Sequence, residues 1–403
     1  MVNILFANCA QFEGKYTNLG DWAIFEAMLQ SMKREIDEKE IEIMVPSADP
    51  DFTVRNYPVR AFQRGGIRGC VNTLQAIIWA DVVLIGGGEI VQDLSSIVYL
   101  PYQFIRPMIA KLFGKKVYGY AIGIGEPWEI SPFGKLQARF ALNRFDAITV
   151  RDMKSKYVAE NYLQVKNKNI FVGADPALVL ETLNGGGVNS SEEYIVFSVR
   201  SVYHREHNLL PFAIRKRFNL ISPRYYEAIK EFKQEIVYVV QKVLQRYPYN
   251  IRFLITYNGR EMSAGDAVFT KDIVNHFSRK ELSRIHMIDE TRPYKLKGIL
   301  GKARLVISVP LHPIILAASE GVPVISLAYA SKSTAFMKEI GMEKYISTVR
   351  NVDEKVDGVA LMDLIDNIDR EHDIISQQIS EKMISLKQRE KENLAHLMKV
   401  IQL

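Results

Sequence analysis

The sequence predicts an α/β protein with two successive parallel sheets, each covered by helices. Short apolar runs alternate with longer amphipathic segments along the chain, a pattern typical of parallel sheets whose strands are joined by helices. The alternation begins at Val2 and begins again at Tyr194. A polar, glycine-rich segment at 184–192 lies between the halves and reads as a linker. We therefore expect domains at 1–183 and 193–350, followed by a charged helical segment at 351–403.

Each half supplies the elements that such a fold requires. In the first half, apolar runs predict strands at 2–8, 41–45, 81–85, 116–120 and 147–150, and amphipathic stretches predict helices from Asp21 to about Glu38, around 97–113 and at 131–143. In the second half, the same signals predict strands at 194–199, 251–256, 304–309 and 323–327, and helices near 224–246, 266–277 and 313–320. Ligands of such sheets bind at the carboxyl ends of the strands, so we expect the chemistry in a central cleft that both halves face.

Composition narrows the class of protein further. The chain has 403 residues, 48% of them hydrophobic and 24% charged, which excludes a disordered protein, a coiled coil and a collagen-like rod. Only two cysteines are present, so a disulfide framework or a Cys-rich zinc site is excluded and a reducing cytoplasm is expected. The longest uncharged stretch, 305–319, contains two prolines and is shorter than the ~20 apolar residues of a membrane-spanning helix.

The charge balance points to an anionic ligand. Lys plus Arg number 52 against 46 Asp plus Glu, a net charge of +6, with an isoelectric point near 9.0. This mild excess suits a phosphorylated substrate or an anionic membrane surface, and no motif for nucleic acid accompanies it. The basic segment 200–224, in which only Glu206 is acidic, suggests a lipid headgroup or diphosphate contact. A solvated loop is the alternative.

Two motifs in the first half lie where strands are expected to end. Asn18, Gly20 and Asp21 open the first helix, so Asp21 either caps this helix or acts on a ligand hydroxyl. Gly86-Gly87-Gly88-Glu89 follows an apolar strand, and its glycines either make a tight turn or admit a ligand close to the backbone. The run lacks the spacing of a dinucleotide-binding motif.

Three motifs in the second half carry cations or an imidazole. Arg200 follows the first strand and is suited to clamping phosphate or carboxylate, although a surface ion pair is the plainer interpretation. His312 is expected where the strand at 304–309 ends, as either a proton-transferring group or a buried structural histidine. Lys332 follows the strand at 323–327 and can bind a phosphate near the start of a helix.

In order along the chain, these segments resemble the polysaccharide pyruvyl transferase family. The likeness is carried by short motifs spread over most of residues 1–340: 18–24, 84–88, 119–123, 150–152, 174–177, 311–312, 321–323 and 329–332. The resemblance implies two Rossmann-like domains arranged as in the two-domain (GT-B type) glycosyltransferases, the first binding the acceptor and the second the donor. It also implies transfer of a pyruvyl group from phosphoenolpyruvate to two hydroxyls of one sugar, which gives a cyclic ketal in bacterial capsule, exopolysaccharide or cell-wall polymer synthesis.

The resemblance also suggests roles for particular residues. His312 and Asp21 would be catalytic, and phosphoenolpyruvate would contact Arg200, Lys332 and Leu311. The nucleotide- or lipid-linked sugar acceptor would contact Asn18, Gly20, Gly86, Gly87, Gly88 and Glu89. No metal or redox cofactor is implied. A cytoplasmic location with peripheral contact at the inner membrane face fits these expectations.

One position departs from the family pattern. The family reads Arg-Leu-His where this chain has Pro310-Leu311-His312, and proline supplies neither charge nor an N–H donor. Either another cation, such as Arg200 or Lys332, takes over the role of the missing arginine, or the donor is bound differently, or the chain is a non-catalytic relative. A sugar-nucleotide-dependent glycosyltransferase of the same architecture is a further alternative.

Overall fold

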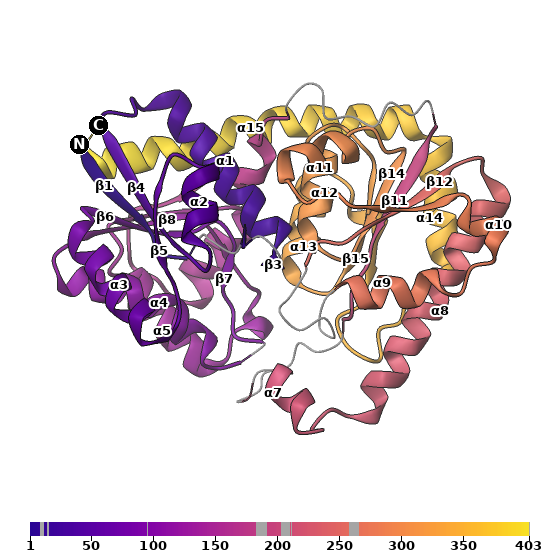
Figure 1. The fold of residues 1–403 in the computed structure, drawn as a ribbon, viewed down its shortest axis with the longest axis horizontal. Coiled ribbons are helices and arrows are strands. Elements are labelled where there is room, and N and C mark those ends of the chain that lie inside the picture. The colour runs from indigo at the N-terminus through magenta and orange to yellow at the C-terminus, as the bar shows by residue number, and fades with distance from the viewer. Residues whose placement is uncertain are drawn as a thin grey trace. The chain divides into compact units, whose positions relative to one another are not determined.

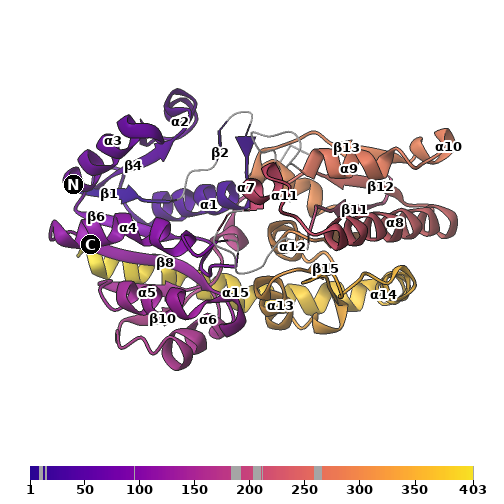
Figure 2. The ribbon, with the colours of Figure 1, turned by 90° about the horizontal axis from the view of Figure 1, so that it is seen from below.

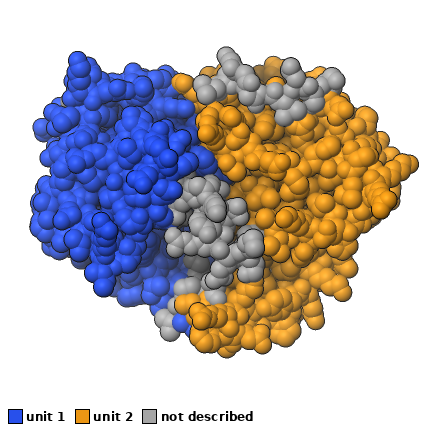
Figure 3. All heavy atoms as spheres, in the orientation of Figure 1, with its two compact units in different colours: residues 1–180, 206–211, 386–403 blue, residues 181–205, 212–385 orange. Residues whose placement is uncertain are grey.

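The computed structural model describes residues 1–8, 12–13, 16–94, 96–182, 192–202, 210, 212–257 and 266–402. The chain divides into two compact units (Figure 3). Unit 1 comprises residues 1–180, 206–211 and 386–403, and unit 2 comprises residues 181–205 and 212–385. The expected linker at 184–192 falls almost entirely outside the described residues.

Unit 1 is built on a parallel sheet with the strand order β10-β9-β8-β6-β1-β4-β5, and β7 pairs with β8 (Figure 1). The strands are β1 (Val2–Phe6), β4 (Ile41–Ser47), β5 (Arg60–Gln63), β6 (Val82–Gly86), β7 (Glu89–Val91), β8 (Lys116–Ile124), β9 (Ala147–Val150) and β10 (Ile170–Val172). A short antiparallel pair, β2 (Phe12–Glu13) and β3 (Tyr16–Thr17), precedes the first helix. This parallel topology is the one predicted from the alternating pattern of the first half.

Helices cover both faces of this sheet. They are α1 (Leu19–Glu35), α2 (Pro50–Asn56), α3 (Gly66–Trp79), α4 (Tyr99–Leu112), α5 (Pro132–Leu142) and α6 (Met153–Tyr157). Side chains alternate along β1 because successive residues of a strand point to opposite faces. Leu5 belongs to the core cluster that includes buried residues of α3, α4 and α5, whereas Phe6 packs edge-on against Phe25 of α1.

The C-terminal helix α15 (His372–Ile401) ends in unit 1. Tyr118 of β8 donates a hydrogen bond to the Asn393 carbonyl at 2.7 Å, and Asn393 Nδ2 donates to the Ala174 carbonyl at 2.8 Å. The ring of His396 stacks on Phe171 of β10 at 3.5 Å between centroids. The last turns of α15 therefore pack on the same side of the sheet as the Tyr118 side chain.

Unit 2 contains a second parallel sheet with the order β13-β12-β11-β14-β15-β16. Its strands are β11 (Tyr194–Ser198), β12 (Asn250–Leu254), β13 (Ile285–Ile288), β14 (Leu305–Ser308), β15 (Val324–Ala328) and β16 (Ile346–Thr348). Its helices are α7 (Phe212–Arg217), α8 (Pro223–Arg246), α9 (Asp266–Val274), α10 (Arg279–Leu282), α11 (Pro293–Leu300), α12 (Leu311–Ala318), α13 (Ser331–Glu339) and α14 (Gly358–Arg370). Figure 2 shows these elements from a second direction.

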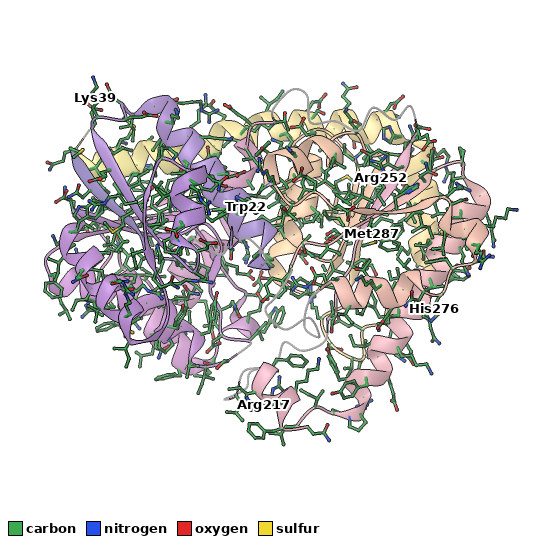
Figure 4. All side chains as sticks on the ribbon, in the orientation of Figure 1. Trp22, Lys39, Arg217, Arg252, His276 and Met287 are labelled. Carbon is green, nitrogen blue, oxygen red and sulfur yellow. The ribbon has the colours of Figure 1, made fainter. Side chains whose placement is uncertain are left out.

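A cation–π contact joins two neighbouring strands of this second sheet. The guanidinium of Arg252 on β12 lies 3.7 Å from the ring centroid of Tyr194 on β11. On the other side of β12, Met287 of β13 pairs in register with Phe253 (Figure 4). Such cation–π packing lets a charged residue occupy a strand that is otherwise apolar.

The hydrophobic pattern of the sequence did not predict every element. The helices α2, α3, α11 and α13 are among those that were not predicted, and so are the short strands β5, β10, β13 and β16. α3 contains two glycines and exposes many apolar side chains, so it lacks the polar outer face by which amphipathic helices are recognised. The four strands have three or four residues each, too few for a periodic signal.

Candidate functional site

Three of the predicted donor and catalytic residues follow three adjacent strands of unit 2. The strands β11, β14 and β15 are hydrogen-bonded neighbours, with Ser198, Ser308 and Ser326 in register. Arg200 follows β11, His312 follows β14 and Lys332 follows β15. Because carboxyl ends of parallel strands meet at one edge of the sheet, the fold brings these three side chains to the same edge. We call them the strand-end row.

Arg200 is held by a carboxylate from the neighbouring strand connection. Its Nε lies 3.3 Å from Oδ1 of Asp266, the first residue of α9. Asp266 is 3% exposed and also accepts hydrogen bonds from the Thr256 hydroxyl at 2.7 Å and the Tyr257 amide at 3.0 Å. The guanidinium of Arg200 lies 5.7 Å from the Tyr257 ring centroid. Arg200 stays partly exposed, so it is oriented and still accessible to a ligand.

His312 lies at the start of a helix and not at the end of a strand, where it was expected. The strand ends at Ser308 and α12 begins at Leu311, so His312 belongs to the first turn of the helix rather than to the strand end. The prolines explain the early start, since Pro310 has an extended backbone at the N-cap and Pro313 falls within the first turn, where a missing N–H costs little. The Ser308 hydroxyl donates to the Pro310 carbonyl at 2.6 Å.

The two neighbours of His312 differ in what they offer a ligand. Leu311 is 3% exposed and belongs to the core, so its side chain supports the turn. Pro310 is also buried, and its side chain carries no charge. The predicted donor-binding cations that the structure describes at this edge are Arg200 and Lys332.

Lys332 completes the strand-end row from the first turn of α13. Its ammonium lies 5.4 Å from the ring centroid of Tyr329, which precedes the helix. Lys332 is half-buried, whereas Ser331 and Ser333 on either side are buried. A cation at a helix N-terminus opposes the helix dipole, a placement that a bound anion would relieve.

The start of α1 in unit 1 holds the predicted acceptor residues Asn18 and Gly20 and the predicted catalytic residue Asp21. Asn18 is the N-cap, and its Oδ1 accepts from the Gly20 amide at 3.1 Å. Asn18 Nδ2 donates to Asp21 Oδ2 at 3.0 Å. Asn18 therefore caps the helix, and Asp21 orients the side chain that does so. Both residues are half-buried.

The glycine run after β6 has two different kinds of position. Gly86 and Gly87 have φ of 147° and 79°. A Cβ on Gly86 would lie 2.0 Å from the Tyr120 carbonyl oxygen, and one on Gly87 would lie 2.3 Å from Cγ2 of Ile24. A Cβ on Gly88 would meet nothing within 4 Å. The first two glycines are thus required by internal packing, and only Gly88 leaves room for a ligand.

Glu89 belongs to a buried charge cluster that we call the Arg151 cluster, consisting of Glu89, Arg151, Asp152 and Asp175. Atoms of the Arg151 guanidinium lie 3.5 Å from Glu89, 3.4 Å from Asp152 and 4.0 Å from Asp175. All four side chains are at most 7% exposed. Each follows or belongs to a strand of unit 1, namely β7, β9 or β10.

The electrostatics of this cluster favour the charged forms of Arg151 and Asp152. Burial acts to lower the pKa of Arg151, but Glu89, Asp152 and Asp175 outweigh it and hold the pKa above its ordinary value. Burial acts to raise the pKa of Asp152, which Lys154, Arg151 and hydrogen bonds from Ser155 together hold below its ordinary value. A Cβ on Gly123 would lie 2.7 Å from Cζ of Arg151, so this glycine makes the space that the guanidinium fills.

Sequence reasoning assigned no role to Arg151, Asp152, Asp175 or Asp266. The first three stand in motifs that carry the family likeness, at 150–152 and 174–177, and their repeated position after strands was the available signal. The residues around Asp266 in the sequence give no signal for its role, because this role depends on the ion pair with Arg200, which lies 66 positions earlier in the chain.

The basic segment 200–224 is described only in part. Its residues 203–209 and 211 lie outside the described residues, including Arg205, Glu206 and Leu209. On α7, Arg215 is buried and lies 5.8 Å from the Phe212 ring centroid, whereas Arg217 is exposed (Figure 4). The cations of α7 thus do not form a single charged face.

Comparison with known proteins identifies the family. Residues 18–331 match the family described as polysaccharide pyruvyl transferase. The chain belongs to the polysaccharide pyruvyl transferase family. It is also similar to the amylovoran biosynthesis protein AmsJ of Erwinia amylovora, with 24% identity over 322 residues, covering 75% of this chain and 70% of that protein. The expected family is confirmed, and membership makes the chain a transferase of polysaccharide biosynthesis.

Solved structures confirm the expected fold class. A UDP-GlcNAc 2-epimerase from Neisseria meningitidis has a TM-score of 0.59 and 11% identity, covering 99% of both chains. A glycosyltransferase from Rickettsia africae has a TM-score of 0.59 and 12% identity, covering 99% of this chain and 98% of that one. Both likenesses concern the fold, two Rossmann-like units of the GT-B type.

The described residues contain neither a cluster of metal ligands nor a membrane-spanning helix. No three His, Cys, Asp or Glu side chains among them are arranged to hold a metal ion. The carboxylates of the Arg151 cluster surround a guanidinium instead. No helix within the described ranges is both long and apolar enough to cross a membrane.

Proposed function

We propose that the protein transfers a pyruvyl group from phosphoenolpyruvate to two hydroxyls of one sugar, forming a cyclic ketal and releasing phosphate. The strand-end row carries this proposal. It provides two cations flanking an imidazole on one sheet edge of unit 2, which matches the needs of a small substrate that bears a carboxylate and a phosphate.

The proposed donor contacts follow from the geometry of each cation. Arg200 has a planar guanidinium fixed by Asp266, which suits bidentate binding of a carboxylate or phosphate. Lys332 lies in the first turn of α13, where helix amide groups and an ammonium can together hold a phosphate. These two residues take the place of the arginine that Pro310 replaces.

The proposed chemistry needs proton transfer at carbon. His312 delivers a proton to the methylene carbon of phosphoenolpyruvate, and an oxocarbenium-like centre forms at the adjacent carbon. One sugar hydroxyl adds to this centre and loses its proton. The second hydroxyl then displaces phosphate and also loses its proton, which closes the ketal. Imidazole suits these transfers because it titrates near neutrality.

The acceptor is assigned to unit 1 on the evidence of Asp21 and Gly88. Asp21 is the acidic side chain of the first turn of α1 and positions or deprotonates a sugar hydroxyl. Gly88 offers backbone next to open space. Gly86, Gly87 and Glu89 support this region through internal contacts. The acceptor is a nucleotide- or lipid-linked sugar, as suits a biosynthetic polysaccharide transferase.

The test is mass spectrometry of candidate sugar acceptors incubated with phosphoenolpyruvate. The expected product is heavier than the acceptor by one pyruvyl ketal, with one phosphate released for each product formed. Phosphate release must require the acceptor. Consumption of a UDP-sugar without any use of phosphoenolpyruvate would replace the proposal with a glycosyltransferase. No turnover of either donor across the acceptor panel would favour a non-catalytic relative.

A further inference from the structure

Helices α3, α4 and α5 cover one face of the unit 1 sheet and lie side by side (Figures 1 and 2). We call their outer surface the three-helix face. Each helix buries apolar side chains inward, such as Ile77 of α3, Phe104 of α4 and Leu142 of α5. The sheet core is therefore already complete without the outward side chains of these helices.

The outward side chains are nevertheless apolar on all three helices. Each helix carries a pair of exposed large apolar residues seven positions apart, which places both members on one side of the helix. The pairs are Ile67 and Leu74, Ile105 and Leu112, and Phe133 and Phe140. Ile67 and Leu112 are 87% and 85% exposed. Soluble proteins rarely leave such a set of large apolar side chains in contact with water.

The charges of this face have one sign. The three helices contain Arg68, Arg106, Lys111, Lys135 and Arg139 and not a single Asp or Glu. Lys111 is paired with Asp146. Arg106 lies over the Tyr102 ring, Lys135 lies over the Tyr162 ring, and Arg139 donates to the neutral Gln164. By contrast, α14 carries Asp363, Asp366 and Asp369.

We propose that the three-helix face docks on the surface of a bilayer that contains anionic lipids. Exposed aliphatic and aromatic side chains insert at the boundary between headgroups and acyl chains, and the surrounding cations meet the lipid phosphates. The arrangement is that of interfacial binding, with helices lying in the plane of the surface. It involves different elements from the basic segment 200–224.

Charge complementarity selects the membrane over a second copy of this chain. In a two-fold symmetric dimer through this face, each patch would meet its own copy. Apart from Lys111, which Asp146 neutralises, the cations of the two copies would then be brought together, and like charges across an interface oppose binding. Anionic lipid supplies the opposite charge. The proposal stands on the surface of unit 1 alone and is independent of the reaction assigned above.

The test is co-flotation of the full-length protein with vesicles. We expect binding to phosphatidylcholine vesicles that contain a third phosphatidylglycerol, weak binding to pure phosphatidylcholine, and release when salt rises from about 0.05 M to about 0.5 M. Replacing one exposed apolar residue on each helix should reduce binding at least tenfold. This variant is Ile67→Ser, Leu112→Ser, Phe133→Ser.

Control variants test whether the loss of vesicle binding is specific to the three-helix face or follows from any change of exposed residues. The triple variant Val359→Ser, Ile374→Ser, Ile384→Ser removes three exposed apolar residues from α14 and α15 and should bind as the wild type does. Replacing Arg68, Arg106 and Arg139 by Gln should reduce binding at least tenfold, whereas replacing Arg279, Lys280 and Lys382 by Gln should not. Circular dichroism melts check that each variant is folded.

Three results would overturn the proposal. One is the absence of binding to anionic vesicles at low salt. Another is equal loss of binding in the face and control variants. The third is light scattering that shows a dimer which the face variant converts to a monomer, without lipid binding by either protein, because the face would then be a contact between copies.

Discussion

Arg200 Nε lies 3.3 Å from Oδ1 of Asp266, a carboxylate that is almost completely buried at the start of α9. The two residues come from the connections that follow β11 and β12, which are neighbouring strands. An arginine that could have been a solvated surface cation is thereby fixed in direction. The pairing gives Asp266 a positioning role in the proposed donor site.

Replacement of Asp266 by Asn should weaken donor binding more than it slows turnover. A hydrogen bond to a charged group contributes about 1.5–3 kcal/mol, so KM for phosphoenolpyruvate should rise at least tenfold while kcat changes less. Asp272→Asn is the control, because Asp272 lies on the same helix but pairs with Lys233. Equal KM values for the two variants, measured by phosphate release, would remove Asp266 from donor positioning.

Replacement of His312 by Ala should lower kcat about 10²–10⁴-fold, the usual contribution of general acid–base catalysis. The fold should survive, because the imidazole is only half-buried in the first turn of α12. His286→Ala, on an exposed position of β13, provides the comparison. Turnover of His312→Ala close to that of His286→Ala would exclude His312 from proton transfer.

The Arg151 cluster should contribute to stability through its guanidinium. Arg151→Met leaves Glu89, Asp152 and Asp175 buried without their shared cation, and breaking a buried ion pair costs about 3–5 kcal/mol. Glu89→Gln should cost less, since two carboxylates still face Arg151. Urea unfolding measures both. A free energy of unfolding for Arg151→Met equal to that of the wild type would contradict the structural role.

The glycine run after β6 offers a matched pair of substitutions. Gly87→Ala should destabilise the protein by more than 1 kcal/mol, because the new methyl group would collide with Ile24 and the backbone has a positive φ. Gly88→Ala should leave the melting temperature unchanged, since its Cβ would enter open space. If Gly88 borders the acceptor, Gly88→Ala should raise KM for the acceptor alone. Equal melting temperatures for both variants would refute this distinction.

The buried carboxyl group of Glu390, near the end of α15, should make the stability of the protein depend on pH. It is 2% exposed, and burial raises its pKa to about 7, although Asn393, Arg34 and Tyr120 act in the opposite direction and Asp175 adds to the rise. Between pH 4.5 and 7 the folded protein holds a proton that the unfolded chain releases. Stability should therefore fall as the pH rises through this range, by about 3 kcal/mol.

The substitution Glu390→Gln tests this directly. The neutral amide should remove most of the pH dependence, so that its melting temperature exceeds that of the wild type at pH 8 and approaches it at pH 5. Glu381→Gln, at an exposed position earlier on the same helix, should melt as the wild type does at both pH values. A parallel pH dependence in wild type and Glu390→Gln would assign the effect to other groups.

The hydrophobic pattern was sufficient to predict the long elements of the fold. Strands such as β9 and helices such as α8 were placed within a residue or two, because long apolar runs and helical periodicity are local properties. The start of α12 was placed two residues late, since Pro310 and Pro313 resemble a break and yet fit an N-cap and a first helical turn.

The sequence by itself determined the family, the α/β class and the strand-end positions of Arg200 and Lys332, because each depends on short motifs or on local periodicity. Only the tertiary structure decided that Asp266 orients Arg200, that Glu89 forms an ion pair with Arg151, and that the last turns of α15 pack on unit 1. It also decided that α3, α4 and α5 lie side by side and expose large apolar side chains. These relationships join residues far apart in the chain, and they exist only where the folded backbone brings the side chains within contact distance.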